Sequence, residues 1–331
     1  MIGTANGARV GITGLGTHVP ERVFTNVDLE QFVDTTDEWI VERTGIRERR
    51  FAEKHEALTD IAGPAALKAM AAAGVEPASI DLIIVATVTP DMMFPTSSAI
   101  LADSLGMPDA AAYDLLAGCT GFMYGIAQAY AMLASGLSKR ALVIGGDVLS
   151  KILDWNDRST LVLFGDGAGA VVMERVEDGG FLGFELGADG GGGENLWLPG
   201  SGSRHFENAD KLVKMNGREV FKFATRVMVA SAEKILAECG KTIEDVDVYV
   251  PHQANRRIID YAAGKLGIPE EKVVVNVHKY GNTSSGSIPL ALADAAADGR
   301  LRKGELVLMT GMGAGLTWGS ALIEWTEGRA A

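Results

Sequence analysis

The chain of 331 residues has only two cysteines, Cys119 and Cys239, and they do not form a Cys-x-x-Cys pair. So few and so widely separated thiols argue against a disulfide framework and against a structural zinc site. They fit a reducing compartment. We therefore expect a cytoplasmic protein without a metal site.

Positive charge and uninterrupted apolar sequence are also scarce. The chain carries 30 Lys and Arg residues against 43 Asp and Glu residues, a formal net charge of −13, which argues against nucleic acid as a partner. The longest apolar stretches are interrupted by Gly, Asp or Gln, so we expect no membrane insertion. Residues Met1 to Val10 lack a basic head followed by an apolar run, so we expect no signal peptide.

Hydrophobic residues, in contrast, make up 47% of the chain, and charged residues make up 22%. This balance is typical of a well-packed α/β protein and excludes a disordered chain. The length is sufficient for two domains of ordinary size.

One unit of sequence occurs twice, at an offset of 161 to 166 residues. The first copy contains, in order, Ile80–Val85, Leu105–Pro108, Gly118–Thr120 and Leu142–Gly146; the second contains Val246–Val250, Leu266–Pro269, Gly281–Thr283 and Val307–Gly311. Helices are expected at Leu58–Ala73, Ser97–Leu105, Val220–Cys239, Arg256–Leu266 and Ile288–Ala297. The alternation predicts two α/β halves, residues 1–178 and 179–331, each with a parallel or mixed sheet covered on both faces.

Cys119 lies between a strand-like run, Ala110 to Leu116, and an apolar helical segment, Phe122 to Ser135. The first N–H groups of a helix lack partners, and its dipole favours an anion. We therefore expect the Cys119 thiol to be shifted toward the nucleophilic thiolate. A single buried cysteine is more often a core residue, so this interpretation depends on the residues around it.

His252 and Asn282 lie in the second copy. His252 directly follows the strand Val246–Val250, and the end of a strand is a usual place for functional residues in α/β sheets. Asn282 occupies the turn that corresponds to the turn of Cys119. A lone His or a turn Asn is unremarkable by itself. If the two halves pack by pseudo-twofold symmetry, the three residues face one interface, which predicts a catalytic site.

The motifs Ala117–Gly121, His252–Asn255 and Gly281–Ser284 resemble those of the β-ketoacyl-acyl carrier protein synthase III family. The resemblance extends to Thr36–Ile46, Phe164–Ala170 and Gly313–Gly319, and it covers essentially the whole chain after a short N-terminal extension. It implies a thiolase-like α/β fold of two duplicated halves with mixed sheets in α-β-α-β-α layers.

The resemblance also implies a reaction. Cys119 takes the acyl group from an acyl-CoA, malonyl-acyl carrier protein loses carbon dioxide, and the enolate attacks the acyl-cysteine. His252 and Asn282 would donate hydrogen bonds to the enolate oxygen, while the backbone N–H groups of Cys119 and Ala314 would bind the second oxyanion. The CoA and phosphopantetheine groups belong to the substrates, so no cofactor is expected.

Further residues take their roles from the resemblance alone. Trp39 and Arg158 would sandwich the adenine of CoA, and Thr35, Arg43, Asn216 and Gly217 would line the rest of the tunnel. Phe94 would close the acyl pocket across a homodimer, and Met312 stands where an aromatic residue often borders that pocket. Lys222, Arg256, Arg257 and Lys265 would form a basic docking patch for the acidic carrier protein.

Several alternatives remain at this point. A thiolase would carry a second cysteine in the turn Gly311–Gly315, and an elongating condensing enzyme would carry a histidine at Asn282. A condensing enzyme of specialised-metabolite synthesis would share the three residues. In a Cys-His-Asn thioester hydrolase, Asn282 would instead orient His252. A non-catalytic acyl-binding protein would need neither His252 nor Asn282.

Overall fold

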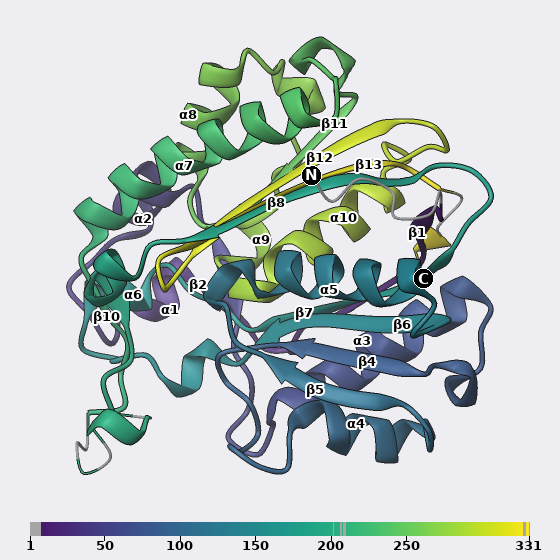
Figure 1. Cartoon of the computed structure of the whole chain (residues 1–331). Coiled ribbons are helices and arrows are strands. Elements are labelled where there is room, and N and C mark those ends of the chain that lie inside the picture. Colours follow the sequence, from purple (N-terminus) through teal and green to yellow (C-terminus); the bar gives the residue numbers. More distant parts are fainter. Residues whose placement is uncertain (1–7, 201, 206, 208–209, 327–328, 331) are drawn as a thin grey trace.

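The computed structural model describes residues 8–200, 202–205, 207, 210–326 and 329–330. Most of Met1 to Val10, where no signal peptide is expected, and part of the polar segment before Asp210 lie outside the described residues. Two sheets form the frame of the described part (Figure 1). One has the order β14 (Arg329–Ala330), β1 (Val10–His18), β7 (Gly167–Arg175), β6 (Arg140–Asp147), β4 (Leu82–Ala86) and β5 (Ala111–Leu115). The other has the order β11 (Val248–Pro251), β12 (Leu306–Gly313), β13 (Thr317–Glu324) and β8 (Gly180–Ala188).

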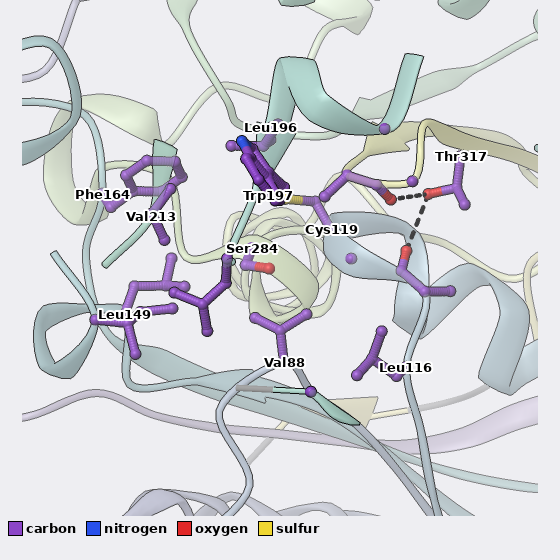
Figure 2. Close-up of a pocket in the computed structure, with 18 residues that line it drawn as sticks. Val88, Leu116, Cys119, Leu149, Phe164, Leu196, Trp197, Val213, Ser284 and Thr317 are labelled. Carbon is purple, nitrogen blue, oxygen red and sulfur yellow. Dashed lines mark hydrogen bonds between the residues drawn. The ribbon is translucent and has the colours of Figure 1, made fainter. Parts of the chain in front are cut away.

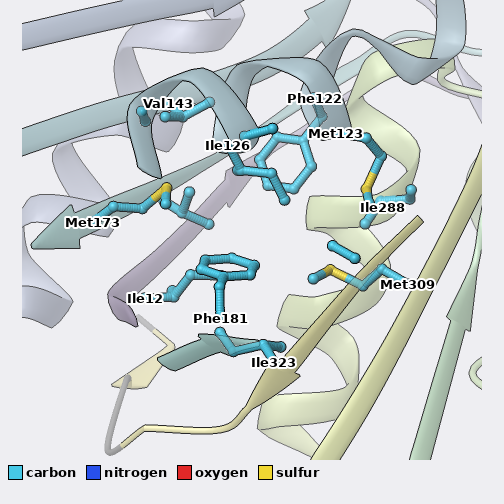
Figure 3. Close-up of a cluster of buried hydrophobic side chains, with 14 of the residues drawn as sticks. Ile12, Phe122, Met123, Ile126, Val143, Met173, Phe181, Ile288, Met309 and Ile323 are labelled. Atoms are coloured by element: carbon cyan, nitrogen blue, oxygen red, sulfur yellow. The ribbon is translucent and has the colours of Figure 1, made fainter. Parts of the chain in front are cut away.

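Helices separate and cover the two sheets (Figure 1). Helices α5 (Gly121–Ser135) and α10 (Ser287–Ala297) lie between the sheets. Helices α3 (Leu58–Ala73) and α4 (Ser97–Leu105) cover the first sheet, and α7 (Gly217–Glu238) and α8 (Arg256–Leu266) cover the second. The core between the sheets joins side chains of α5, such as Phe122 and Ile126, to Phe181 and Ile323 of the second sheet (Figure 3). The predicted α-β-α-β-α layers are confirmed.

The duplication is visible in the strand register. In the first sheet β4 pairs with β6 in parallel, with Leu82 opposite Ala141; in the second, β11 pairs with β12 in parallel, with Val248 opposite Val307. Antiparallel neighbours follow in the same order, β7 and β1 in one sheet, β13 and β8 in the other. The two halves therefore repeat one architecture, as the sequence repeat predicts. The boundary after Asp178 stays a prediction.

The expected helices occur near their expected bounds. Those at α3, α4 and α8 match residue for residue. Helix α7 begins at Gly217, earlier than the expected Val220, because Asn216 Oδ1 caps it by accepting a hydrogen bond from Glu219 N. None of the helices within the described residues is long and apolar enough to cross a membrane.

Short elements complete the frame around the interface of the halves. They are β2 (Val23–Thr25), α1 (Asn26–Leu29), α2 (Asp37–Thr44), β3 (Glu48–Arg50), α6 (Arg158–Leu161), β9 (Leu196–Trp197), β10 (Lys214–Met215) and α9 (Val277–Tyr280). Two 3₁₀ turns, Gly118–Thr120 before α5 and Ser284–Gly286 before α10, occupy corresponding places in the two halves. The fold therefore brings both predicted functional turns to the centre of the molecule.

Candidate active site

Cys119 lies in the 3₁₀ turn between β5 and α5, and its residue is buried. A Cβ atom on Gly313 would lie 2.5 Å from the Cys119 backbone nitrogen, and one on Gly118, where φ is 56°, would lie 2.8 Å from the Ala314 nitrogen. Only glycine permits this contact between the two turns. The turns that carry the backbone N–H groups of Cys119 and Ala314 therefore pack directly against each other, and both N–H groups favour the thiolate form of Cys119.

Two threonines join the same turns. Thr120 Oγ1 donates to the Ala117 carbonyl at 2.7 Å and contacts Thr317 Oγ1 at 2.8 Å. Thr317 Oγ1 lies 3.0 Å from the Ala117 carbonyl oxygen and 2.9 Å from that of Ala314 (Figure 2). These contacts hold the Ala314 turn in place beside Cys119.

His252 follows β11 directly and is only 1% exposed. Neither of its ring nitrogens has a hydrogen-bond partner among the described residues. Burial lowers the pKa of His252 to about 4, because the imidazolium cation would lose its hydration. The side chain is therefore neutral at pH 7 and has one N–H to donate.

The other polar residues of the His252 motif serve the backbone. Gln253 Nε2 donates to the carbonyl oxygens of Pro251 and Val274, while Gln253 Oε1 accepts from Asn276 N at 2.8 Å and from Val277 N. The Asn255 side chain caps helix α8, and its Nδ2 donates to the Arg43 carbonyl at 3.2 Å. Gln253 thus fixes the turn after His252, and Asn255 ties α8 to α2.

Both the backbone N–H and the backbone carbonyl of Asn282 form hydrogen bonds that fix its position. Its backbone N–H donates to the Leu163 carbonyl, and its own carbonyl accepts from Gly165 N, each at 2.9 Å. The side-chain Oδ1 accepts from Ser284 N at 2.8 Å. Since Oδ1 is occupied, the Nδ2 amide is the part of Asn282 that can donate to a ligand.

Two cavities meet at Cys119. The first measures about 540 Å³ and is mostly apolar. Its lining includes Val88, Leu116, Leu149, Leu196, Trp197, Val213 and Ser284 (Figure 2). The second measures about 560 Å³, and its lining includes His252, Asn282 and a group of cationic side chains. Cys119, Phe164 and Leu196 border both cavities.

The expectation of a thiolate at Cys119 in the free protein is wrong. Burial raises the pKa of Cys119 to about 11, and the negative charge of Asp147 acts in the same direction. The backbone N–H groups of Cys119 and Ala314 favour the thiolate, as the helix-start argument expects, but loss of hydration outweighs them. The resting nucleophile is therefore a thiol.

The residues that the resemblance assigns to CoA divide into two groups. Trp39, Arg43, Arg158 and Gly217 line the second cavity. Asn216 and Thr35 do not: Asn216 caps α7, and the Thr35 hydroxyl is buried without a hydrogen-bond partner among the described residues.

The Arg158 guanidinium lies 4.7 Å from the centre of the Trp39 ring, and its Nη1 donates to the Asp34 carbonyl. A base stacked between two groups needs roughly 7 Å between them, two van der Waals spacings. Trp39 and Arg158 thus contact each other here, and the predicted sandwich would require them to separate.

Two of the four cations in the predicted docking patch form salt bridges with carboxylates, and the other two form none with any described residue. Arg257 and Lys222 line the second cavity. Lys222 pairs with Glu219 at 2.7 Å, and Arg256 pairs with both Asp260 at 2.5 Å and Glu270 at 2.9 Å. Arg257 lies over the Phe221 ring, and Lys265 lies over the Tyr261 ring. Neither Arg257 nor Lys265 pairs with a carboxylate within the described part of the chain.

The two residues assigned to the acyl pocket lie elsewhere in the single chain. Met312 is buried and lines the second cavity rather than the first. Phe94 is 83% exposed and borders neither cavity. Sequence reasoning missed Trp197 and Leu196, which do line the first cavity, because nothing in their local sequence indicates contact with Cys119. It gave no role to Ser284, which also lines this cavity, although Ser284 lies in the motif Gly281–Ser284.

No group of three or more His, Cys, Asp or Glu side chains could hold a metal ion among the residues described.

Comparison with known proteins identifies the family. The family described as 3-oxoacyl-[acyl-carrier-protein (ACP)] synthase III matches residues 113–190, and its C-terminal counterpart matches residues 236–325. The chain is 52% identical to the β-ketoacyl-[acyl-carrier-protein] synthase III of Desulfitobacterium hafniense (strain Y51) over 96% of this chain and 98% of that protein. It is 54% identical to the enzyme of the same name from Symbiobacterium thermophilum, again over 96% and 98% of the two chains.

A solved structure supports the same assignment. The β-ketoacyl-[acyl carrier protein] synthase III of Thermus thermophilus superposes with a TM-score of 0.91 at 49% identity, covering 96% of this chain and 99% of that one. Sequence and fold agree along nearly the full length of both proteins. The chain belongs to the β-ketoacyl-[acyl-carrier-protein] synthase III family.

Proposed function

We propose that this chain carries out the condensation of its family with Cys119, His252 and Asn282 as the catalytic residues. The reaction joins an acyl-CoA to malonyl-acyl carrier protein, releases CoA and carbon dioxide, and initiates type II fatty-acid synthesis. CoA and phosphopantetheine enter as parts of the substrates, and the protein itself supplies every catalytic group.

In the first step the Cys119 sulfur attacks the acyl-CoA carbonyl. The S–CoA bond breaks, and the thiol proton leaves with the CoA sulfur. The backbone N–H groups of Cys119 and Ala314 lie in the two turns that pack together at Cys119, where they can donate to the carbonyl oxygen as it becomes negative. The apolar first cavity takes the acyl chain.

In the second step malonyl-acyl carrier protein occupies the second cavity and loses carbon dioxide. The electron pair of the broken C–C bond moves to the α-carbon and the thioester oxygen. His252 and the Asn282 amide line the same cavity as Cys119 and can donate to that oxygen. The α-carbon then attacks the acyl carbonyl, the C–S bond to Cys119 breaks with its electron pair on the sulfur, and the thiolate takes a proton from solvent to restore the thiol.

The orientation of Asn282 is the observation that carries this proposal. In a Cys-His-Asn hydrolase the asparagine orients the histidine. Here Asn282 Oδ1 accepts from Ser284 N, and His252 has no ring hydrogen bond to any described residue. Both side chains are thus free to donate to a ligand, which favours a synthase over a hydrolase.

Product analysis tests the function directly. Incubation with a panel of acyl-CoA primers and malonyl-acyl carrier protein should give carbon dioxide and a 3-oxoacyl thioester. Free fatty acid and CoA without carbon dioxide would instead identify a thioester hydrolase. The primer that reacts fastest would identify the acyl group that the first cavity accepts.

Arg257 is expected to dock the carrier protein, because it is an exposed cation at the second cavity without a carboxylate partner among the described residues. Arg257→Glu should raise the KM for malonyl-acyl carrier protein roughly tenfold and leave acylation of Cys119 by acyl-CoA unchanged. Steady-state kinetics with each substrate varied in turn measures both effects.

Arg256→Glu is the matched control for this patch. Arg256 is the neighbouring residue on α8, but Asp260 and Glu270 already neutralise it, so its reversal should raise that KM less than the Arg257 reversal does. Equal damage to both half-reactions by Arg257→Glu would contradict a docking role and indicate a folding defect.

A homodimer is expected from an exposed apolar group, Met92, Met93, Phe94 and Leu116, of which Phe94 is 83% exposed and Leu116 77% exposed. Leu116 directly follows β5, the edge strand of the first sheet, so a second copy could cover these side chains. Sedimentation of the wild-type chain at micromolar concentration should therefore show a dimer.

Phe94→Asp should shift this equilibrium toward monomer. Leu137→Asp changes an equally exposed leucine next to the amino end of β6 and should leave the dimer intact. A stable, active wild-type monomer would remove the basis for the dimer.

A further inference from the structure

Arg49 is a buried arginine that the reaction above does not use. It lies on β3, is 0% exposed, and forms no ion pair with a carboxylate among the described residues. Burial lowers the pKa of Arg49 to about 10, so the guanidinium is still a cation at pH 7. Burying a cation without an opposite charge is costly, so the partners of its N–H groups indicate its role.

The partners of the Arg49 guanidinium are neutral oxygen atoms on two separate segments of the chain. Nη1 donates to Asn26 Oδ1 at 2.7 Å and to the Phe24 carbonyl at 3.4 Å. Nη2 donates to the Val162 carbonyl at 2.9 Å. The planar fork of the guanidinium therefore ties segment 162–166 to β2 and to the start of α1.

Two further hydrogen bonds fix the same edge of segment 162–166. Asp166 N donates to the Arg50 carbonyl at 2.8 Å, and Ala52 N donates to Asp166 Oδ2 at 2.8 Å. The segment is thus held at both of its ends by the chain in and after β3.

The other edge of segment 162–166 pairs with Asn282. Phe164 and Asn282 form a parallel bridge, in which Asn282 N donates to the Leu163 carbonyl and Gly165 N donates to the Asn282 carbonyl, each at 2.9 Å. Phe164, between these two bonds, borders both cavities (Figure 2). The position of the Asn282 backbone therefore depends on the position of this segment.

The Arg49 side chain also packs against the glycines on either side of this pairing. A Cβ on Gly165 would lie 3.1 Å from the Arg49 Cβ and 2.2 Å from the Tyr280 carbonyl oxygen. A Cβ on Gly281 would lie 3.4 Å from the Arg49 Cβ. Since the interior is closely packed here, a displacement of Arg49 would shift both segments of the pairing.

We infer that Arg49 is a positioning residue for Asn282: its guanidinium anchors segment 162–166, and that segment sets the place from which the Asn282 amide donates to the enolate oxygen. The inference rests on the proposed role of Asn282 as an oxyanion donor. It extends the site to a residue that itself borders neither cavity.

The first test compares decarboxylation with acylation in two variants. Arg49→Met removes every donor, and Arg49→Lys keeps a cation but not the planar fork. Each should lower kcat for decarboxylation of malonyl-acyl carrier protein in a Cys119→Ala background by roughly 10- to 100-fold, because the donor is misplaced. The KM for that substrate should stay unchanged, since Asn282 acts on charge that develops in the transition state. With Cys119 present, acylation should stay close to wild type.

A double variant tests whether Arg49 acts through Asn282. If it does, adding Arg49→Met to Asn282→Ala should cause no further loss of decarboxylation. Arg175→Met is the matched control. The Arg175 guanidinium also donates to two backbone carbonyls, those of Leu133 and Ala134 at the carboxyl end of α5, so this variant should keep both half-reactions.

Hydrogen exchange of the backbone amides tests the anchoring without any substrate. In Arg49→Lys the N–H groups of Asn282 and Gly165 should exchange about tenfold faster, while those of β4 should not, because only the pairing held by Arg49 is loosened. If neither Arg49 variant folds, Asn26→Ala removes the closest acceptor of Nη1 and should cause the same local changes at smaller amplitude.

Normal decarboxylation in a folded Arg49→Met or Arg49→Lys variant would overturn the inference. An equal loss of both half-reactions, a further loss on top of Asn282→Ala, or unchanged exchange at Asn282 in whichever variant folds would do the same. A failure of the proposed function looks different: the Cys119→Ala protein with Arg49 intact would release no carbon dioxide, while faster exchange at Asn282 in Arg49→Lys would still support the anchoring.

Discussion

Cys119→Ala should abolish acyl-enzyme formation, by roughly 10⁴-fold or more, while malonyl-acyl carrier protein still loses carbon dioxide. Among the described residues that border both cavities, Cys119 alone carries a thiol that can form a thioester. His252 and Asn282 make no hydrogen bond to Cys119, so their positions do not depend on it. Radiolabelled acyl-CoA measures the acyl-enzyme, and trapped carbon dioxide measures the decarboxylation.

Cys239→Ala is the control for thiol loss. Cys239 follows α7 and packs against β8, where a Cβ on Gly183 would lie 2.8 Å from its sulfur. This substitution should leave acylation unchanged. An acyl-enzyme that persists in Cys119→Ala and disappears in Cys239→Ala would show that Cys239, and not Cys119, is the nucleophile.

Asn282→Ala should lower decarboxylation by roughly 10²- to 10³-fold, the usual cost of deleting one oxyanion donor, and retain measurable acylation of Cys119. His252→Ala should also lose decarboxylation. Acylation should be better preserved in Asn282→Ala than in His252→Ala, because the Asn282 side chain contacts Ser284 N rather than the sulfur.

Asn282→Asp sharpens this experiment. It keeps an oxygen that accepts from Ser284 N but removes the amide donor, so it should lose decarboxylation as Asn282→Ala does. Normal decarboxylation together with failed acylation in Asn282→Ala would contradict the assignment and support a hydrolase-like role in which Asn282 orients His252.

The pH dependence of decarboxylation reports the charge of His252. Burial lowers its pKa to about 4, so the imidazole is neutral at every pH well above that value. Decarboxylation by Cys119→Ala should therefore show no inflection near pH 6.5, where an exposed histidine would titrate. An inflection near pH 6.5 would contradict the neutral, buried state of His252.

The sequence predicted those parts of the fold that depend on local pattern and repetition. The constant offset between the two copies anticipated the shared register of β4 with β6 and of β11 with β12. The turns of Cys119 and Asn282 could be located because each follows an apolar strand or precedes an apolar helix.

Properties set by packing between distant segments could not be predicted in this way. The raised pKa of Cys119 depends chiefly on burial by segments that pack around its turn, and the local sequence does not show that burial. The contact of Trp39 with Arg158 joins α2 to α6. Trp197 reaches the first cavity from β9, whose local sequence gives no sign of it.

The junction of the two cavities at one sulfur has a kinetic consequence. Under the proposed mechanism, the acyl group stays in the first cavity after CoA has left the second, so the second cavity takes both thioester substrates in succession. The enzyme then alternates between a free and an acylated form, which is a ping-pong sequence with parallel double-reciprocal plots. Since the two thioesters would then compete for the second cavity, an excess of either one should slow the turnover of the other, and the relative supply of the two should set the flux.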